Sequence, residues 1–258
     1  MCLIIFAHRV NNNYPLVLSA NRDEFFSRKS REAKFWREEV GCSNLLAGKD
    51  LEAGGTWIGI TKDGKFAAIT NLRRNPEDDQ ALVSRGALTL EYLIGKESPY
   101  NFAKKVFGNL ASYKGFNLLL GSKKEIVLLN SREKSISTLG PGIYAFSNNA
   151  LNLNHPKTVR GKNKLTELLN NKTELNPDLL IDMMKDKTMS SNKSLPRSTL
   201  PKDLEEKLSA IFVSDPERNY GTLCSTAIVT NSDGNTKFIE QNYDRLGRPT
   251  RSHYFEYS

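Results

Sequence analysis

The chain has 258 residues, with 38% hydrophobic and 26% charged residues, a composition typical of a soluble globular protein rather than a disordered one. Its 37 basic and 29 acidic residues give a net charge of +8. The basic residues are scattered and are not interleaved with aromatic ones, so we expect a solvated surface and no nucleic-acid binding. No long apolar span occurs, and contact with a membrane would therefore be peripheral at most.

The three cysteines, Cys2, Cys42 and Cys224, are too far apart for a disulfide framework and lack the spacing of zinc ligands. We expect no metal site and a reducing compartment. The first apolar run breaks at His8 and Arg9, too early for the core of a signal peptide. These features together predict a cytoplasmic protein.

A cysteine stands at the start of the first predicted strand. Cys2 follows Met1, and the apolar run Leu3–Phe6 predicts a buried strand. A thiol side chain is small enough for methionine aminopeptidase to remove Met1, so we expect a mature chain beginning with Cys2. Its α-amine titrates near ~8 and its thiol near ~8.5, so one residue could hold both a nucleophile and its general base. The alternative is that Cys2 is a small core residue in an ordinary strand.

Four polar residues, Asn21-Arg22-Asp23-Glu24, follow the second predicted strand, Leu16–Ala20. The turn-forming Asn11–Asn13 predicts that the first two strands form a hairpin. In one interpretation the polar cluster caps the strand end with salt bridges. In the other, Arg22 and Asp23 turn toward Cys2, where a carboxylate would orient an ammonium and a guanidinium would favour the thiolate.

Two further hairpins are predicted, over residues 54–71 and 224–242. The glycines that open the first of these would allow close approach of another backbone or a ligand. Asn71 and Asn148 lie at the ends of predicted strands, where each side chain could close a turn or donate to an oxyanion. Phe35 and Trp36 are expected in a loop packed over the core.

The remaining periodicity predicts helices and strands in alternating runs. The expected helices cover 84–94, a segment from Pro99, 158–169, 178–185 and 204–212, and the expected strands 116–120, 126–129 and 143–146. This order predicts an α+β fold with mostly antiparallel sheets in a four-layer αββα arrangement. We expect a single domain over residues 1–258, with 186–202 as a mobile loop that could act as a lid.

Taken together, the motifs resemble the NRDE family, also called the transport and Golgi organisation protein 2 family. The residues that carry the resemblance are Met1-Cys2, Asn21–Glu24, Gly54–Trp57, Thr70-Asn71, Phe116–Leu118, Ser147-Asn148 and Tyr220–Thr222. The resemblance implies an N-terminal-nucleophile hydrolase-like fold. It also implies a role in intracellular haem handling, as a chaperone or in export, with haem as the transported ligand.

The implied fold is similar to that of cysteine-type amidases of the bile-salt hydrolase and penicillin V acylase kind. By that similarity, Cys2 would be the nucleophile with its α-amine as base. Asp23 would hold the amine, Arg22 would tune the thiolate, and Asn71 and Asn148 would be oxyanion donors. Two features depart from the pattern. Arg22 and Asp23 are adjacent, so in a regular strand their side chains would point to opposite faces. Leu223 stands where relatives often carry an arginine.

Three functions remain open at the level of sequence. The protein could bind and move haem without turnover, with Cys2, His8, His155 and His253 as candidate axial ligands, although none lies in a haem motif. It could be an enzyme that hydrolyses a C–N amide of a small molecule through Cys2. It could also be an inactive interaction scaffold, and fold analogy alone does not select among these. The whole-chain resemblance favours haem handling, with the other two functions as alternatives.

Overall fold

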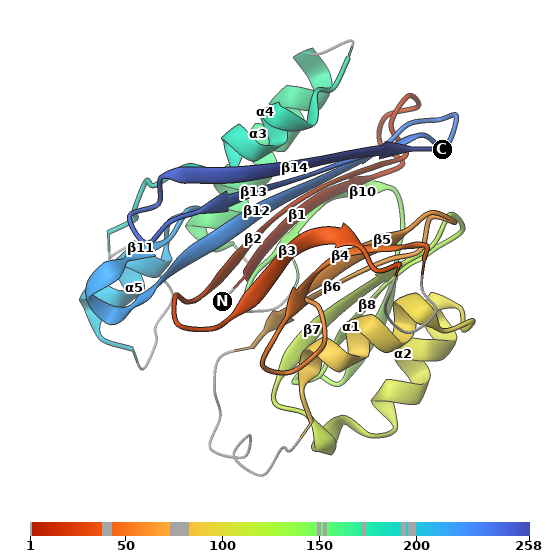
Figure 1. Cartoon of the computed structure of the whole chain (residues 1–258), viewed down its shortest axis with the longest axis horizontal. Coiled ribbons are helices and arrows are strands. Elements are labelled where there is room, and N and C mark those ends of the chain that lie inside the picture. The colour runs from red at the N-terminus through yellow and green to blue at the C-terminus, as the bar shows by residue number, and fades with distance from the viewer. Residues whose placement is uncertain are drawn as a thin grey trace. The chain divides into compact units, whose positions relative to one another are not determined.

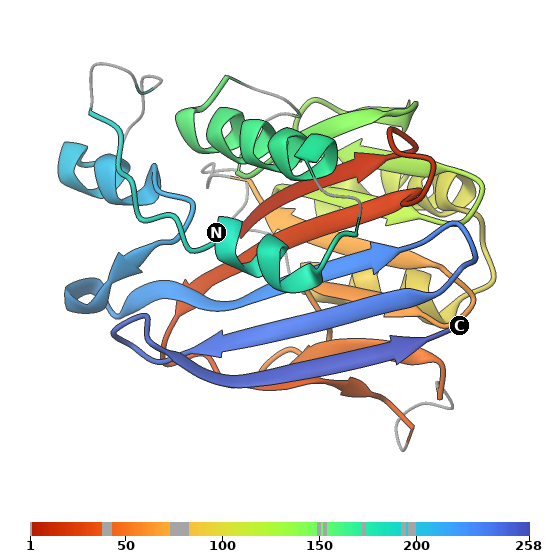
Figure 2. The same ribbon diagram turned by 90° about the horizontal axis from the view of Figure 1, so that it is seen from above.

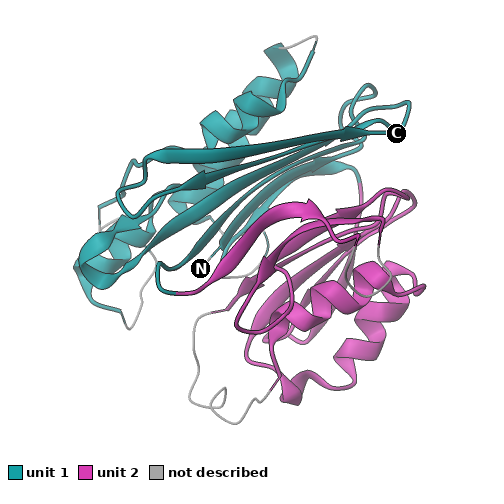
Figure 3. Cartoon of the chain, in the orientation of Figure 1, with its two compact units in different colours: residues 1–27, 141–147, 151–258 teal, residues 28–140, 148–150 magenta. Residues whose placement is uncertain are grey.

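The computed structural model describes residues 2–37, 43–72, 83–148, 151, 154–171, 174–191, 195 and 200–258. The chain divides into two compact units, shown in different colours in Figure 3. The first unit comprises Met1–Ser27, Pro141–Ser147 and Leu151–Ser258, and the second comprises Arg28–Gly140 and Asn148–Ala150. That both units belong to one domain stays a prediction.

The first unit contains an antiparallel sheet with the strand order β10-β1-β2-β12-β13-β14, and β11 pairs with β12 (Figure 1). The predicted hairpins β1–β2 and β12–β13 are therefore confirmed. The strands are β1 (Cys2–His8), β2 (Leu16–Phe25), β10 (Gly142–Phe146), β11 (Ser214–Asp215), β12 (Tyr220–Thr230), β13 (Thr236–Tyr243) and β14 (Pro249–Tyr257).

Helices of the first unit cover one face of this sheet, as the view from above shows (Figure 2). They are α3 (Pro156–Asn171) and α4 (Pro177–Met183), whereas α5 (Lys202–Leu208) lies beyond the end of the strands. Alternate residues of β1, Leu3, Ile5 and Ala7, enter the core formed with α3 and α4. Phe6 lies on the opposite face, where its ring stacks on Tyr144 at 5.2 Å between centroids. Both faces of β1 are thus buried, which explains its unbroken apolar sequence.

The second unit contains an antiparallel sheet in chain order from β3 to β9. Its strands are β3 (Ser30–Phe35), β4 (Leu45–Asp50), β5 (Ile58–Thr61), β6 (Phe66–Asn71), β7 (Phe116–Gly121), β8 (Ile126–Asn130) and β9 (Ser135–Leu139). Helices α1 (Arg85–Ile94) and α2 (Pro99–Phe107) pack on one face of it, around Trp36, Tyr92 and Phe102. The predicted α+β class with antiparallel sheets is confirmed in both units.

Several elements differ from their predicted bounds. Phe35 ends β3 rather than lying in a loop, and the side chain of Trp36 is fully buried. β3 was not predicted because it is an edge strand in which only Ala33 is buried, so its sequence lacks an apolar alternation. The helix predicted over 204–212 ends at Leu208, because the apolar residues that follow it are buried in an irregular segment instead.

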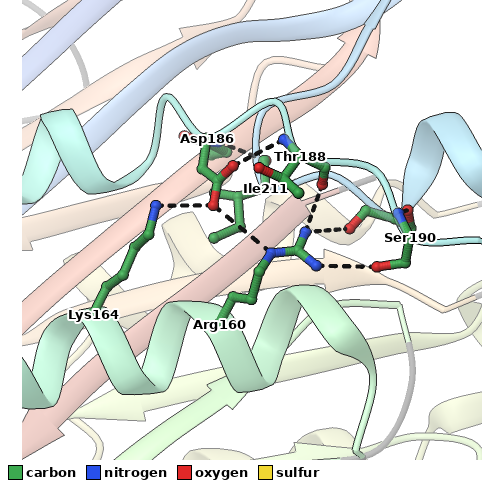
Figure 4. A network of polar contacts seen from close by, with 8 residues as sticks. Arg160, Lys164, Asp186, Thr188, Ser190 and Ile211 are labelled. Carbon is green, nitrogen blue, oxygen red and sulfur yellow. Dashed lines mark hydrogen bonds and ion pairs between the residues drawn. The ribbon is translucent and has the colours of Figure 1, made fainter. Parts of the chain in front are cut away.

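The predicted mobile loop 186–202 begins with an anchored segment (Figure 4). Asp186 accepts a hydrogen bond from Lys164 Nζ at 2.8 Å. Arg160 donates to the carbonyl oxygen of Thr188 at 2.7 Å and to Ser190 Oγ at 3.0 Å. These contacts tie residues 186–190 to α3, whereas 192–194 and 196–199 lie outside the described residues.

Candidate nucleophile site

The site is organised by the pairing of β1 with β2. Cys2 is the first residue of β1 and lies directly opposite Arg22 of β2. Opposed residues of an antiparallel pair project from the same face of the sheet, so the thiol and the guanidinium side chain share a face. The Cys2 side chain is half-buried, whereas Arg22 is only 5% exposed.

Arg22 also lies opposite Cys224 of β12, on its other side. Cys224 is 3% exposed, and burial raises the pKa of its thiol well above the ordinary value. The buried Glu240 raises that pKa further and Arg22 lowers it. Arg22 therefore separates two cysteines of different exposure, of which Cys2 is the more accessible.

Electrostatics at Cys2 favour the protonated thiol. Burial raises the pKa of the Cys2 thiol, and the negative charge of Asp23 raises it further. The charge of Arg22 and the backbone N–H of Asp23, which donates to the sulfur, act in the opposite direction. Because the net shift is upward, the thiol is protonated at neutral pH, and its use as a nucleophile requires a base.

Asp23 lies on the opposite face of β2 from Arg22, on the side covered by helices. It pairs with Thr222 of β12, whose hydroxyl donates to Asp23 Oδ1 at 2.7 Å. The carboxyl group is 1% exposed, and burial raises its pKa. The positive charge of the N-terminal ammonium, that of Lys157 and the hydrogen bond from Thr222 lower the pKa and so oppose this effect.

The structure corrects the predicted position of the polar cluster. Asn21, Arg22, Asp23 and Glu24 lie within β2, which continues to Phe25, rather than after the strand. Pairing with β12 prolongs the strand through these residues. Asn21 is structural, because its amide donates to the carbonyl oxygens of Met184 at 3.0 Å and Ile211 at 2.9 Å.

The two predicted oxyanion donors, Asn71 and Asn148, belong to the second unit. Asn71 ends β6, as predicted, and Asn148 Nδ2 donates to the backbone carbonyl of Asn71 at 2.5 Å. The structure thus brings these two residues together, and their role toward Cys2 stays a prediction. Within the first unit, Ser147 Oγ donates to the carbonyl oxygen of Cys2 at 2.8 Å and anchors the start of β1.

Three contributors to the site were not predicted as site residues: Ser147, Lys157 and Thr222. Ser147 and Thr222 belong to motifs that carry the family resemblance, so the pattern contained a signal for them. Lys157 lies in a helix that reads as generally basic, and nothing in the sequence separates it from its exposed neighbours. Leu223 is the extra residue of a β-bulge between Thr222 and Cys224.

The candidate haem ligands differ in accessibility. His8 and His155 are buried, at 6% and 4% exposure, whereas His253 and Cys2 are partly exposed. Burial lowers the pKa of His8.

Among the residues that the structure describes, no three His, Cys, Asp or Glu side chains gather as a metal site. Within the same residues, no helix has both the length and the apolar composition needed to cross a bilayer.

Comparison with known proteins places this geometry in context. The sequence matches the Transport and Golgi organisation 2 family over residues 1–245. It is 34% identical to the Transport and Golgi organization protein 2 homolog of Bos taurus, over 97% of this chain and 96% of the relative. The human homolog is 32% identical, over 93% of this chain and 92% of the relative. One similar solved structure, the Caenorhabditis elegans N-acylethanolamine-hydrolyzing acid amidase ortholog, has a TM-score of 0.46 and 11% identity, covering 88% of this chain and 92% of that one.

Proposed function

This chain belongs to the Transport and Golgi organisation 2 family, and we propose that it hydrolyses a C–N amide bond with the thiol of Cys2 as nucleophile. The observation that supports this function best is the position of Cys2 at the start of β1, with Arg22 opposite it and the N–H of Asp23 donating to its sulfur. A guanidinium and a backbone donor at a thiol stabilise the thiolate that forms during attack.

The proposal requires cleavage of the Met1–Cys2 peptide bond, which gives Cys2 a free α-amine. In an antiparallel pair, the chain before Cys2 runs toward the position opposite Asp23. The amine would therefore stand at the strand end, between the thiol on one face and the Asp23 carboxylate on the other. The adjacency of Arg22 and Asp23 suits this arrangement, because the charge of Arg22 would act on the thiol of Cys2 and the charge of Asp23 on its α-amine.

The reaction follows from these positions. The amine takes the Sγ proton, directly or through a water molecule, as the sulfur bonds to the amide carbonyl carbon. The oxyanion of the resulting tetrahedral intermediate needs hydrogen-bond donors, the role that the family resemblance implies for Asn71 and Asn148. The C–N bond breaks as the ammonium returns the proton to the leaving amine. Water then hydrolyses the thioester, releasing a carboxylic acid and restoring the thiol.

The first test is the intact mass of the purified protein, followed by turnover of a panel of N-acyl amino acids and N-acyl amines. We expect a mass lacking Met1 and release of free amine that is lost in both Cys2→Ser and Cys2→Ala. Cys224→Ser is the matched control, since Cys224 also neighbours Arg22 but is buried, and it should retain activity. Retention of Met1, or equal turnover by Cys2→Ala, would refute the mechanism.

A second candidate function is haem trafficking. It is favoured by the partial exposure of Cys2 and His253, two of the candidate axial ligands, whereas His8 and His155 are buried. A cysteine thiolate is a known type of axial ligand for haem iron. The net charge of +8 would suit the haem propionates.

Haem titration separates the two candidates. Under haem trafficking, adding haemin to the purified protein gives a saturable Soret shift that weakens in Cys2→Ala and persists in His8→Ala. If the Soret shift is unchanged by substitution of Cys2, His155 and His253, these residues are not haem ligands. If the protein shows no Soret shift and no turnover, the remaining function is that of an inactive interaction scaffold.

The proposed compartment is the cytoplasm. Cys2 and Cys224 are both free thiols, which is the usual state in a reducing compartment. Localisation of the tagged chain by microscopy and cell fractionation tests this, and enrichment in an oxidising lumen would contradict it.

A further inference from the structure

A cavity of about 290 Å³ lies in the first unit, at the end of the sheet opposite to Cys2. The β1–β2 and β12–β13 turns form this end, beside the C-terminus (Figure 1). Ligand pockets in proteins begin at about this volume, so the cavity would take only a small molecule. The lining residues that decide its chemistry are Tyr14, Glu174, Leu175, Val229, Lys237 and Glu256.

The floor of the cavity is a row of side chains across three strands. Lys237 of β13 lies directly opposite Val229 of β12 on one side and directly opposite Glu256 of β14 on the other. Opposed residues of antiparallel strands project from the same face of a sheet. Because Val229 belongs to the core formed with the helices, Lys237 and Glu256 project from that face as well.

Lys237 supplies the positive charge of the cavity. Its side chain is 33% exposed, and its Nζ lies 3.8 Å from Glu174 Oε1, which is beyond hydrogen-bonding distance. A lysine ammonium offers three N–H donors. The lysine can therefore donate to a ligand in the cavity, and a carboxylate accepts the strongest hydrogen bonds from an ammonium.

Two carboxylates flank this ammonium. Glu174 belongs to the connection between α3 and α4 and is 81% exposed at its side chain, and Glu256 lies across the β13–β14 pair. Glu256 Oε2 accepts a hydrogen bond from the hydroxyl of Tyr254 at 2.8 Å, and a carboxylate has acceptor sites for further donors. The lining thus combines one cation with two anions, which suits a molecule that carries both a carboxylate and an ammonium.

Apolar side chains complete the lining, and hydrogen bonds fix its walls. Leu175 and Val229 are each 2% exposed, and Tyr14 packs against the same core. The hydroxyl of Tyr14 accepts a hydrogen bond from the N–H of Leu175 at 3.0 Å. The N–H of Ser232 donates to the carbonyl oxygen of Asn13 at 2.9 Å. These bonds join the two turns and the α3–α4 connection, so the lining is ordered before a ligand binds, which lowers the entropic cost of binding.

We propose that this cavity binds a small zwitterion with an aliphatic side chain, a ligand of the α-amino acid class. Lys237 binds the carboxylate of the ligand, and Glu174 and Glu256 hold its ammonium. The aliphatic side chain contacts Leu175 and Val229. The site lies at the other end of β1 from Cys2, and its ligand does not depend on the proposed amide hydrolysis.

The test compares three molecules of similar shape: leucine, 4-methylpentanoate, which lacks the ammonium, and isoamylamine, which lacks the carboxylate. NMR follows the methyl signals of Leu175 and Val229, with the exposed Leu246 as the control signal. We expect leucine to shift Leu175 and Val229 saturably, without shifting Leu246. Its Kd should be at least about tenfold lower than that of either analogue, the usual effect of one hydrogen bond to a charged group. Absence of a shift with leucine up to about 10 mM, or equal binding of all three molecules, would overturn the proposal.

Substitutions assign the charges to the two ends of the ligand. Lys237→Met should weaken leucine and 4-methylpentanoate at least about tenfold without weakening isoamylamine. Glu256→Gln should weaken leucine and isoamylamine without weakening 4-methylpentanoate. Lys185→Met is the matched control, because Lys185 pairs with Asp182 at 2.8 Å outside the cavity, and it should leave all three affinities unchanged. Leucine binding that neither Lys237→Met nor Glu256→Gln alters would contradict the proposed contacts. The comparison of the three molecules on the unmodified protein decides the proposal even if a variant does not fold.

Discussion

Cys2 and Arg22 occupy directly opposed positions in neighbouring antiparallel strands, so the thiol and the guanidinium side chain project from one face of the sheet. A charge that favours the Cys2 thiolate, in addition to that of the N-terminal ammonium, thus comes from across the strand pair. Asp23, one residue further, reaches the same thiol through its backbone N–H while its carboxylate lies on the other face. Arg22 and Asp23 therefore have opposite effects on the pKa of the Cys2 thiol: the charge of Arg22 lowers it and the charge of Asp23 raises it. The titration of this thiol thus reports on both residues.

Replacing Arg22 should slow the reaction of Cys2 with iodoacetamide. The Arg22 charge lowers the pKa of the Cys2 thiol, so Arg22→Gln raises that pKa and reduces the thiolate fraction. The rate near pH 8 should therefore be lower in Arg22→Gln than in the unmodified protein. The difference should narrow at higher pH, where the thiolate predominates in both proteins. Arg22→Lys, which keeps the charge, should lie between them, and equal rates at every pH would show that Arg22 does not tune the thiol.

Cys2 and Cys224 should differ in their reactivity in the folded protein. Cys224 is 3% exposed, and burial raises its pKa well above the ordinary value, whereas Cys2 is half-buried. We expect iodoacetamide to modify Cys2 at least about ten times faster than Cys224. Peptide mass spectrometry measures both rates in a Cys42→Ser background, since Cys42 lies outside the described residues. Guanidinium chloride should abolish the contrast, and preferential native labelling of Cys224 would contradict the assigned burial.

The sequence supports much of the fold because local patterns and tertiary structure agree there. Leu3–Phe6 reads as a buried strand and is one, and the turn at Asn11–Asn13 predicts the β1–β2 pairing that brings Cys2 opposite Arg22. Proline and alternation locate α2 and the β12–β13 hairpin in the same way. These elements can be predicted from local sequence, without information on which distant residues contact them.

The remaining features depend on distant contacts. β2 continues through Asn21–Glu24 only because β12 pairs alongside it, so the polar cluster reads as a strand end. Lys157 is buried by a segment that begins 51 residues later in the chain. The register shift at Leu223 has no local turn residue to reveal it. The convergence of Asn71 and Asn148 on Cys2 stays a prediction for the same reason.

Gly55 should not tolerate a side chain, because α1 begins against it. A Cβ built at Gly55 would lie 2.4 Å from the backbone carbonyl carbon of Gly86 and 2.5 Å from its oxygen, which confirms the expected close approach of another backbone. Gly55→Ala should displace α1 and lower the free energy of unfolding by about 2 kcal/mol, within the usual range for overpacking.

The control for Gly55 is Gly140→Ala, since a Cβ at Gly140 meets no heavy atom within 4 Å. Urea unfolding followed by circular dichroism compares the two variants. If the urea midpoint of Gly55→Ala equals that of Gly140→Ala, α1 can move to accommodate the added methyl group without a loss in the free energy of unfolding.

Asp186 should stabilise the fold in a pH-dependent way. Hydrogen bonds from Lys164 and from Thr188 lower the pKa of Asp186 to about 2, against the opposing effect of burial. A depressed pKa contributes stability that is present above the unfolded-state value of 3.8 and is lost as the pH falls toward 2. The side chain is 10% exposed, so solvent screening is limited, and the contribution at pH 7 is on the order of 2 kcal/mol.

Asp186→Asn should therefore lower the urea midpoint at pH 7, and its difference from the unmodified protein should shrink as the pH falls from 3.8 toward 2. Asp182→Asn is the matched control, because Asp182 pairs with Lys185 at 2.8 Å but its side chain is 64% exposed. An exposed pair contributes about 0.5 kcal/mol or less, so this variant should remain close to the unmodified protein throughout. Equal effects of the two substitutions, or an Asp186→Asn effect that is constant with pH, would show that the network in Figure 4 does not hold an ionised carboxylate.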